Sequence, residues 1–166
     1  MAKLKIVHYP NPILAKKAEP VASAKSVERK FLKGMVEIMY QDDGVGLAAP
    51  QVGVSKQIIV ISPRAKKCEE RILFNPEILE ESGEEIGLEG CLSLPGISGE
   101  VRRAVQITFQ AMDIQGNLIK ETVIGFEARV IQHEVDHLNG KVFIDRVDFD
   151  TRQRLLNTYM RQLAAS

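Results

Sequence analysis

Two histidines and a glutamate lie close together in the run HEVDH, which occupies residues 133–137. Because a helix turns once every 3.6 residues, side chains four positions apart lie on one face, about one turn apart. His133 and His137 could therefore bind one metal ion, with Glu134 beside a water molecule on that metal. This spacing predicts a metal-dependent hydrolase whose two ligands and base share one rigid helix.

A third ligand is needed, because an accidental HExxH is expected about once in a few hundred chains of this size. Some zinc peptidases carry a third histidine six residues after the second, but Phe143 occupies that position here. The remaining histidine, His8, lies in a proline-rich N-terminal stretch, which we expect to form an extended arm. The third ligand must therefore come from another residue type.

Cys91 is the best candidate for that ligand, since a thiolate binds zinc or ferrous iron strongly. Gly90 precedes it, and Pro95 and Gly96 follow, so turns should expose backbone N–H groups near the sulfur. A free cysteine is more often a small buried apolar residue, and the two histidines are what favour the ligand interpretation. Cys68 lies in a charged run, and we interpret it as an incidental residue of a surface loop.

The composition predicts one ordinary globular domain spanning residues 1–166, with 45% hydrophobic and 27% charged residues. The formal net charge is zero. The chain therefore lacks the excess of basic residues that would suggest DNA as a partner. No apolar run approaches the ~20 residues of a membrane span, and the N-terminus lacks the apolar core of a secretion signal. We therefore expect a cytoplasmic protein with reduced thiols.

Apolar residues at helical spacing predict helices over residues 26–42, 126–139 and 151–163. Gly140 should end the second helix, and Asp150 should cap the third. The third helix should bury a stripe of apolar and aromatic side chains, made of Leu155, Leu156, Tyr159 and Leu163.

The middle of the chain has the patterns of strands. Short apolar or alternating runs predict strands at 57–61, 72–75, 76–79, 105–111 and 118–124. Successive strands with helices gathered at both ends predict an α+β fold rather than a parallel sheet. In this fold antiparallel strands pack around a central metal-ligand helix, with a first helix near the N-terminus and a C-terminal helix.

Three segments carry a resemblance to a known family: GVGLAAPQ at 44–51, EGCLS at 89–93 and HEVDH at 133–137. In this order they closely resemble the signature motifs of the bacterial peptide deformylases, and the likeness covers most of the chain. That family removes the formyl group from the N-terminal formylmethionine of newly made proteins and releases formate. The resemblance implies one divalent metal held by Cys91, His133 and His137. It implies ferrous iron in the cell, with zinc, nickel and cobalt as alternatives.

The resemblance also implies the roles of the residues around the metal. Glu134 is the general base and acid, while hydroxide on the metal attacks the formyl carbon. Gln51 and the backbone N–H of Leu92 hold the developing oxyanion. These roles suit the chemistry, because metal lowers the pKa of bound water to ~7 and two N–H donors suit an oxyanion.

The glycine-rich segment could bind a substrate peptide, because Gly46 has no side chain and lets a peptide backbone approach closely. The substrate methionine needs an apolar pocket, and the resemblance suggests Val45, Phe126 and Val130, although plain core packing also suits these residues. Arg129 departs from the family's apolar pocket, and we expect it at a charged rim or facing solvent.

The expected partners are formylmethionyl nascent peptides and, in transient contact, the ribosome; we expect neither DNA nor a membrane. Two other classes of function stay open. Cys91 could be the nucleophile of a cysteine hydrolase that has a histidine base and needs no metal. Alternatively, the chain could be a zinc-stabilised binding module, although such sites usually have four Cys or His ligands and three good ones are visible here.

Overall fold

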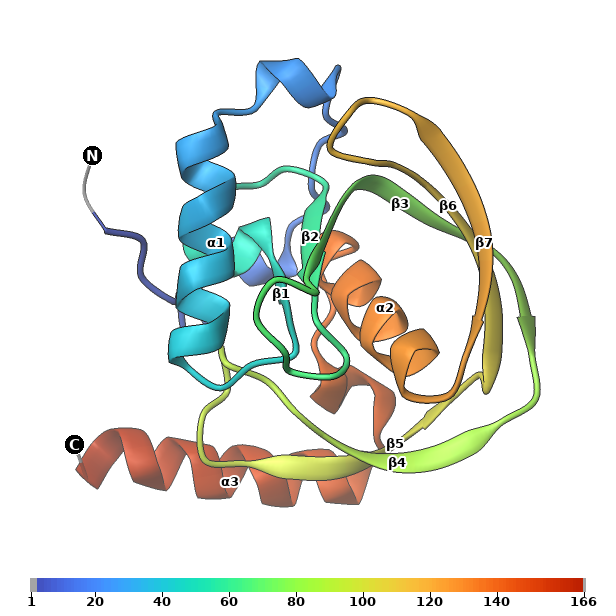
Figure 1. The fold of residues 1–166 in the computed structure, drawn as a ribbon. Helices are drawn as coiled ribbons and strands as arrows, with labels where there is room; N and C mark the ends of the chain where they lie inside the picture. Colours follow the sequence, from blue (N-terminus) through green and yellow to red (C-terminus); the bar gives the residue numbers. More distant parts are fainter. Residues whose placement is uncertain (1–2, 166) are drawn as a thin grey trace.

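The computed structural model describes residues 3–165, and Figure 1 shows a curved antiparallel sheet around a central helix. Within these residues the α-helices are α1 (Arg29–Gln41), α2 (Gly125–Leu138) and α3 (Phe149–Ala165). Short 3-10 helices occur at η1 (Pro12–Ala15), η2 (Ala24–Ser26), η3 (Ala49–Val52) and η4 (Phe143–Arg146). The predicted α+β class, with its central, N-terminal and C-terminal helices, is confirmed.

The main sheet of the described residues has the strand order β1-β2-β3-β6-β7, and each neighbouring pair is antiparallel. Its strands are β1 (Gly46–Ala48), β2 (Ile58–Ile61), β3 (Arg71–Ser82), β6 (Gln106–Met112) and β7 (Leu118–Ile124). The two strands predicted at 72–75 and 76–79 form one long strand. Asn75 and Pro76 lie at a register shift, and the strand continues through it. β1 lies at the edge of this sheet.

Helices cover both faces of the sheet, which explains the fully apolar run in β2. Ile59 and Ile61 pack in one core cluster with Ile131 of α2. Ile58 and Val60 point the other way and pack in a second cluster with Met35 of α1. Because successive strand side chains alternate between faces, a strand covered on both sides is apolar at every position.

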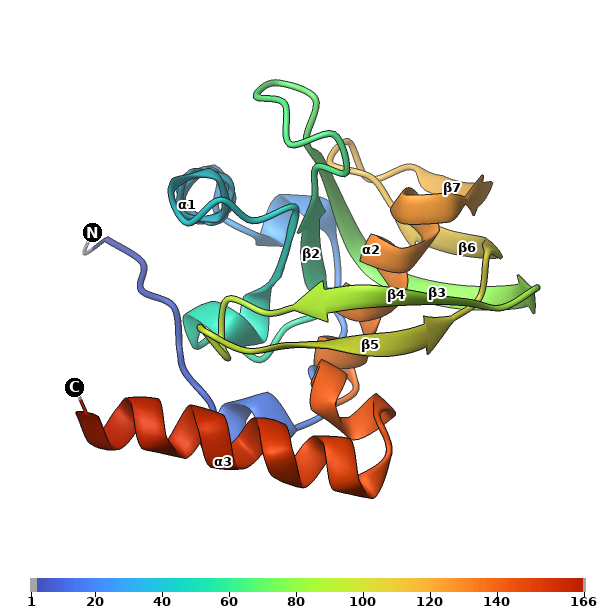
Figure 2. The same cartoon turned by 90° about the horizontal axis from the view of Figure 1, so that it is seen from below.

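A second sheet, made of β4 (Glu85–Gly90) and β5 (Ser98–Arg103), carries the segment before Cys91. This hairpin was not predicted, because its glycines and charged residues hide the strand pattern. Figure 2 shows the hairpin between α2 and α3. A third core cluster joins it to α3 and η4 through Val101, Phe143 and Tyr159.

The structure corrects four predictions about α1 and α3. α1 begins at Arg29 rather than at residue 26, because η2 takes up Ser26. α3 begins at Phe149, and its cap is Asp148 rather than Asp150: the Asp148 carboxylate accepts a hydrogen bond from Thr151 N at 2.8 Å. Leu163 is 44% exposed rather than buried, since the last turns of α3 project beyond the hairpin (Figure 1). Across residues 3–165, none of the helices combines the length and the apolar character that a membrane span requires.

The N-terminal arm is extended and forms hydrogen bonds with two segments, one at Gln51 and one at Ser93. Val7 N donates to the Gln51 carbonyl at 2.7 Å, and Tyr9 N donates to the Ser93 carbonyl at 2.8 Å. On the opposite side of the arm, the Tyr159 hydroxyl of α3 donates to the Tyr9 carbonyl at 2.8 Å. The arm therefore connects α3 with the segments around Gln51 and Cys91.

Candidate active site

Cys91 and the two histidines of α2 lie close together, where Cys91 and His133 line a cavity and His137 is fully buried. One ligand atom from each of Cys91, His133 and His137 lies within 4.8 Å of the others. Cys91 Sγ is 3.3 Å from His137 Nε2, and the two imidazole centroids are 5.1 Å apart. The fold thus brings a thiol from the end of β4 to the pair that helical periodicity placed on one face.

The electrostatics of the three side chains favour binding of a cation. Desolvation of the sulfur disfavours the thiolate, but the charge of His137 and hydrogen bonds from both histidines lower the pKa of Cys91 to about 5. Desolvation opposes protonation of His133, but its hydrogen bond to Cys91 and nearby carboxylates raise its pKa well above the usual range. One thiolate and two imidazoles form a suitable donor set for a divalent metal, which would replace the protons.

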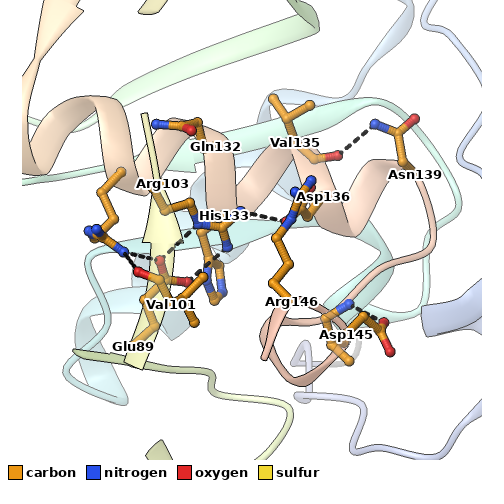
Figure 3. A network of polar contacts seen from close by, with 12 residues as sticks. Glu89, Val101, Arg103, Gln132, His133, Val135, Asp136, Asn139, Asp145 and Arg146 are labelled. Atoms are coloured by element: carbon orange, nitrogen blue, oxygen red, sulfur yellow. Dashed lines mark hydrogen bonds and ion pairs between the residues drawn. The ribbon is translucent and has the colours of Figure 1, made fainter. Parts of the chain in front are cut away.

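Glu89 orients His133 for such a role. His133 Nδ1 lies 2.8 Å from Glu89 Oε1, and the same carboxylate accepts two hydrogen bonds of 2.8 Å from Arg103 (Figure 3). Burial opposes ionisation of Glu89, but the hydrogen bonds from Arg103 and His133 hold its pKa well below the usual range. A carboxylate at Nδ1 makes that nitrogen a donor, which leaves Nε2 of His133 as the nitrogen that could bind a metal.

Glu134 is buried beside the ligands, and Oε1 of its carboxylate has no hydrogen-bond partner among the described residues. Burial raises its pKa, while the two histidines act in the opposite direction. A Cβ added at Gly46 would overlap the Glu134 carboxylate. Glycine at this position therefore makes room for the acid itself, in addition to the predicted room for a substrate backbone.

Gln51 is 2% exposed, and both ends of its amide are engaged. Its Oε1 accepts a hydrogen bond from Ala48 N at 2.9 Å. Its Nε2 lies 3.2 Å from Ser93 Oγ and 3.4 Å from Cys91 Sγ. The first contact fixes which way the amide points, so its N–H group is directed towards the Cys91 side of the cavity.

The cavity has a volume of about 730 Å³, and its walls come from the glycine-rich segment, the hairpin and α2. All four substrate-binding candidates from the sequence line it, namely Val45, Gly46, Phe126 and Val130. Leu92 lines it as well. Phe126 is 52% exposed, whereas Val130 is buried and also packs in the core. Leu88 and Ile97 are further apolar lining residues, which the sequence analysis missed together with the hairpin.

Of the two alternatives expected for Arg129, a charged rim or a solvent-facing side chain, the solvent-facing one was wrong. Arg129 is 8% exposed, lines the cavity, and its Nη1 donates to Glu89 Oε2 at 2.6 Å. Glu89 and Arg103 were also missed as partners of the site. The one available signal was the place of Glu89, an acid two residues before the ligand Cys91.

Comparison with known proteins agrees with this geometry. Residues 3–153 match the family model described as polypeptide deformylase. A peptide deformylase from Carboxydothermus hydrogenoformans is 45% identical over 148 residues, which cover 89% of this chain and 95% of that protein. A peptide deformylase from Nitrosococcus oceani is 44% identical over 155 residues, or 93% of both chains. The crystal structure of a peptide deformylase from Legionella pneumophila superposes with a TM-score of 0.88 at 38% identity, covering 99% of each chain.

Proposed function

Because the chain belongs to the polypeptide deformylase family, we propose a mechanism in which its own side chains carry out this family's reaction. The enzyme removes the formyl group from the N-terminal formylmethionine of new proteins and releases formate. Residues 1–166 act as a single catalytic domain. The observation that carries the mechanism is the convergence of Cys91, His133 and His137 to within 4.8 Å beside a buried glutamate.

Cys91, His133 and His137 hold one divalent metal. This assignment is supported by the thiolate character of Cys91 and by the hydrogen bond of 2.8 Å between Glu89 and His133 Nδ1. When bound, the metal supplies Lewis acidity, which lowers the pKa of a water molecule towards ~7. Ferrous iron is the metal in the cell, and zinc, nickel or cobalt can replace it, since all four accept thiolate and imidazole ligands.

Glu134 moves the proton in this mechanism. The unpartnered Oε1 of its carboxylate takes a proton from the attacking water and gives it to the amine that leaves. Its position next to His133 in the chain puts it beside the reacting centre without making it a ligand. Gly46 leaves the space that this carboxylate occupies.

Gln51 and the backbone N–H of Leu92 stabilise the negative charge that develops on the formyl oxygen. For Gln51 the support is its fixed amide, whose carbonyl end is held by Ala48 N at 2.9 Å. Because the formyl oxygen carries more negative charge in the transition state than in the bound substrate, a fixed N–H donor stabilises the transition state more.

The peptide binds in the cavity between β1 and the hairpin. β1 is an edge strand, so the substrate backbone can pair with it at Gly46 in an extended conformation. The methionine side chain packs against Val45, Phe126 and Val130. The enzyme is cytoplasmic and contacts the ribosome transiently, and it binds neither DNA nor membranes.

The test of this function is formate release from a formylmethionyl peptide before and after metal removal. We expect activity to disappear when a chelator strips the protein and to return when ferrous iron is added without oxygen. An acetylmethionyl peptide should react much more slowly, because the extra methyl must fit into a closely packed site. Activity that survives complete metal removal would instead favour a cysteine hydrolase, for which the Cys91–His137 contact of 3.3 Å would be the catalytic pair.

A further inference from the structure

Arg129 holds both strands of the hairpin against α2. Its Nη1 donates to Glu89 Oε2 at 2.6 Å and to the Val101 carbonyl of β5 at 2.9 Å. Its Nη2 donates to the Glu85 carbonyl of β4 at 2.8 Å. One guanidinium on α2 therefore engages a carboxylate and a backbone group on β4, together with a backbone group on β5.

The hairpin is shaped to receive this guanidinium at Gly87. A Cβ added to Gly87 would lie 2.9 Å from Arg129 Cζ, closer than real Cβ contacts come, and 3.0 Å from its Nε, so the guanidinium would have to move. The backbone of Gly87 does not have a positive φ, so its conformation alone does not require glycine. The missing side chain at Gly87 instead leaves the space that Arg129 fills.

Arg129 and His133 bind the same carboxylate from positions one helical turn apart. Arg129 contacts Oε2 of Glu89, and His133 Nδ1 lies 2.8 Å from Oε1. Glu89 is also two residues before Cys91 in the chain. Whatever fixes Glu89 on α2 therefore also fixes the distance between the thiol of Cys91 and the imidazoles of α2.

We propose that Arg129 is a positioning residue that holds the strand before Cys91 on the ligand helix, so that the three metal ligands are in place before a metal binds. The proposal rests on the assignment of Cys91, His133 and His137 as ligands. The hydrogen bonds of Arg129 run to Glu89 and to the backbone of both hairpin strands, so it acts on the ligands through these groups. Lysine cannot replace it, since an ammonium group lacks the planar fork that reaches three acceptors.

Cobalt release measures this role without depending on catalysis. In cobalt-loaded protein mixed with excess chelator, we expect Arg129→Met to release the metal about tenfold faster than the parent chain. Loss of a group that supports a ligand typically costs about 10- to 100-fold in metal affinity or activity. Arg129→Lys should release cobalt only slightly more slowly than Arg129→Met does.

Arg146→Gln is the matched control, because Arg146 belongs to the same ion network but contacts Asp136 instead of Glu89 (Figure 3). Cobalt release from this variant should stay within about twofold of the parent rate. More contacts separate Arg146 from His133 than separate Arg129 from it, so its loss should affect the ligands less. Equal acceleration in Arg129→Met and Arg146→Gln would mean that the network acts only through general stability, and would overturn the proposal.

Gly87→Ala provides a second variant that keeps every charge, should Arg129→Met fold poorly. Its new Cβ displaces the guanidinium, so cobalt release should again accelerate by several fold. In the Arg129→Met background the same substitution should add less than about twofold, because the guanidinium it would displace is gone. Parent-like cobalt release from both single variants would overturn the positioning role, whereas a parent chain that takes up no cobalt would overturn the metal site itself.

Discussion

Replacing Gly46 with alanine should disable the enzyme by moving Glu134. The added Cβ would overlap the Glu134 carboxylate, and Glu134 is 4% exposed, so the acid has little free space into which to move. Overpacking of this kind costs about 1–3 kcal/mol of stability. At roughly 2–4 °C per kcal/mol for a chain of this size, the melting temperature should fall by roughly 2–12 °C.

The kinetic effect should be larger than the loss of stability suggests. A displacement of about 1 Å in a catalytic group can lower the rate by a factor of about 100. We therefore expect kcat for a formylmethionyl peptide to fall about 100-fold in Gly46→Ala, while the metal content stays near that of the parent. Formate release under saturating substrate, with metal analysis of the same sample, measures both quantities.

Gly34→Ala is the matched control for this substitution. Gly34 lies within α1, and a Cβ there would meet the end of the flexible Leu4 side chain at 3.0 Å. That variant should keep its kcat. If Gly46→Ala also kept a kcat within about twofold of the parent at equal metal content, Glu134 would not be the group that transfers the proton.

Three further substitutions test the roles of single residues. Cys91→Ala should lose most of its bound metal, and full metal retention would remove Cys91 from the site. Glu134→Gln should keep the metal and lower the rate by about 100-fold or more, whereas near-normal turnover would refute a base at this position. Gln51→Ala should lower kcat by roughly 100- to 1000-fold with little change in KM, which corresponds to about 3–4 kcal/mol for one oxyanion donor. A Gln51→Ala protein that melts earlier but keeps its kcat would mean that Gln51 serves only to hold Ala48 N.

Local patterns predicted much of the architecture. Helical periodicity located α1, α2 and α3 to within a few residues, and strict alternation located β6, because these signals depend on neighbours in the chain. Errors occurred where local signals compete: Asp148 and Asp150 could both cap α3, and the hairpin strands are rich in glycine and charge. The roles assigned to Glu134, Gln51 and Leu92 stay predictions until the substitutions are measured.

By itself the sequence determined that two imidazoles and an acid are available for metal chemistry. At their spacing these groups must share one region of a helix, wherever that helix lies. The sequence also identified the family through three ordered motifs. Tertiary structure decided how the parts meet: Cys91 lies 3.3 Å from His137 across 46 residues of chain, and Arg129 is turned inward to the carboxylate of Glu89. The same packing left Gly46 as the space for Glu134. These contacts depend on long-range packing and on the cost of burying an unpaired charge, which no pattern along the chain reports.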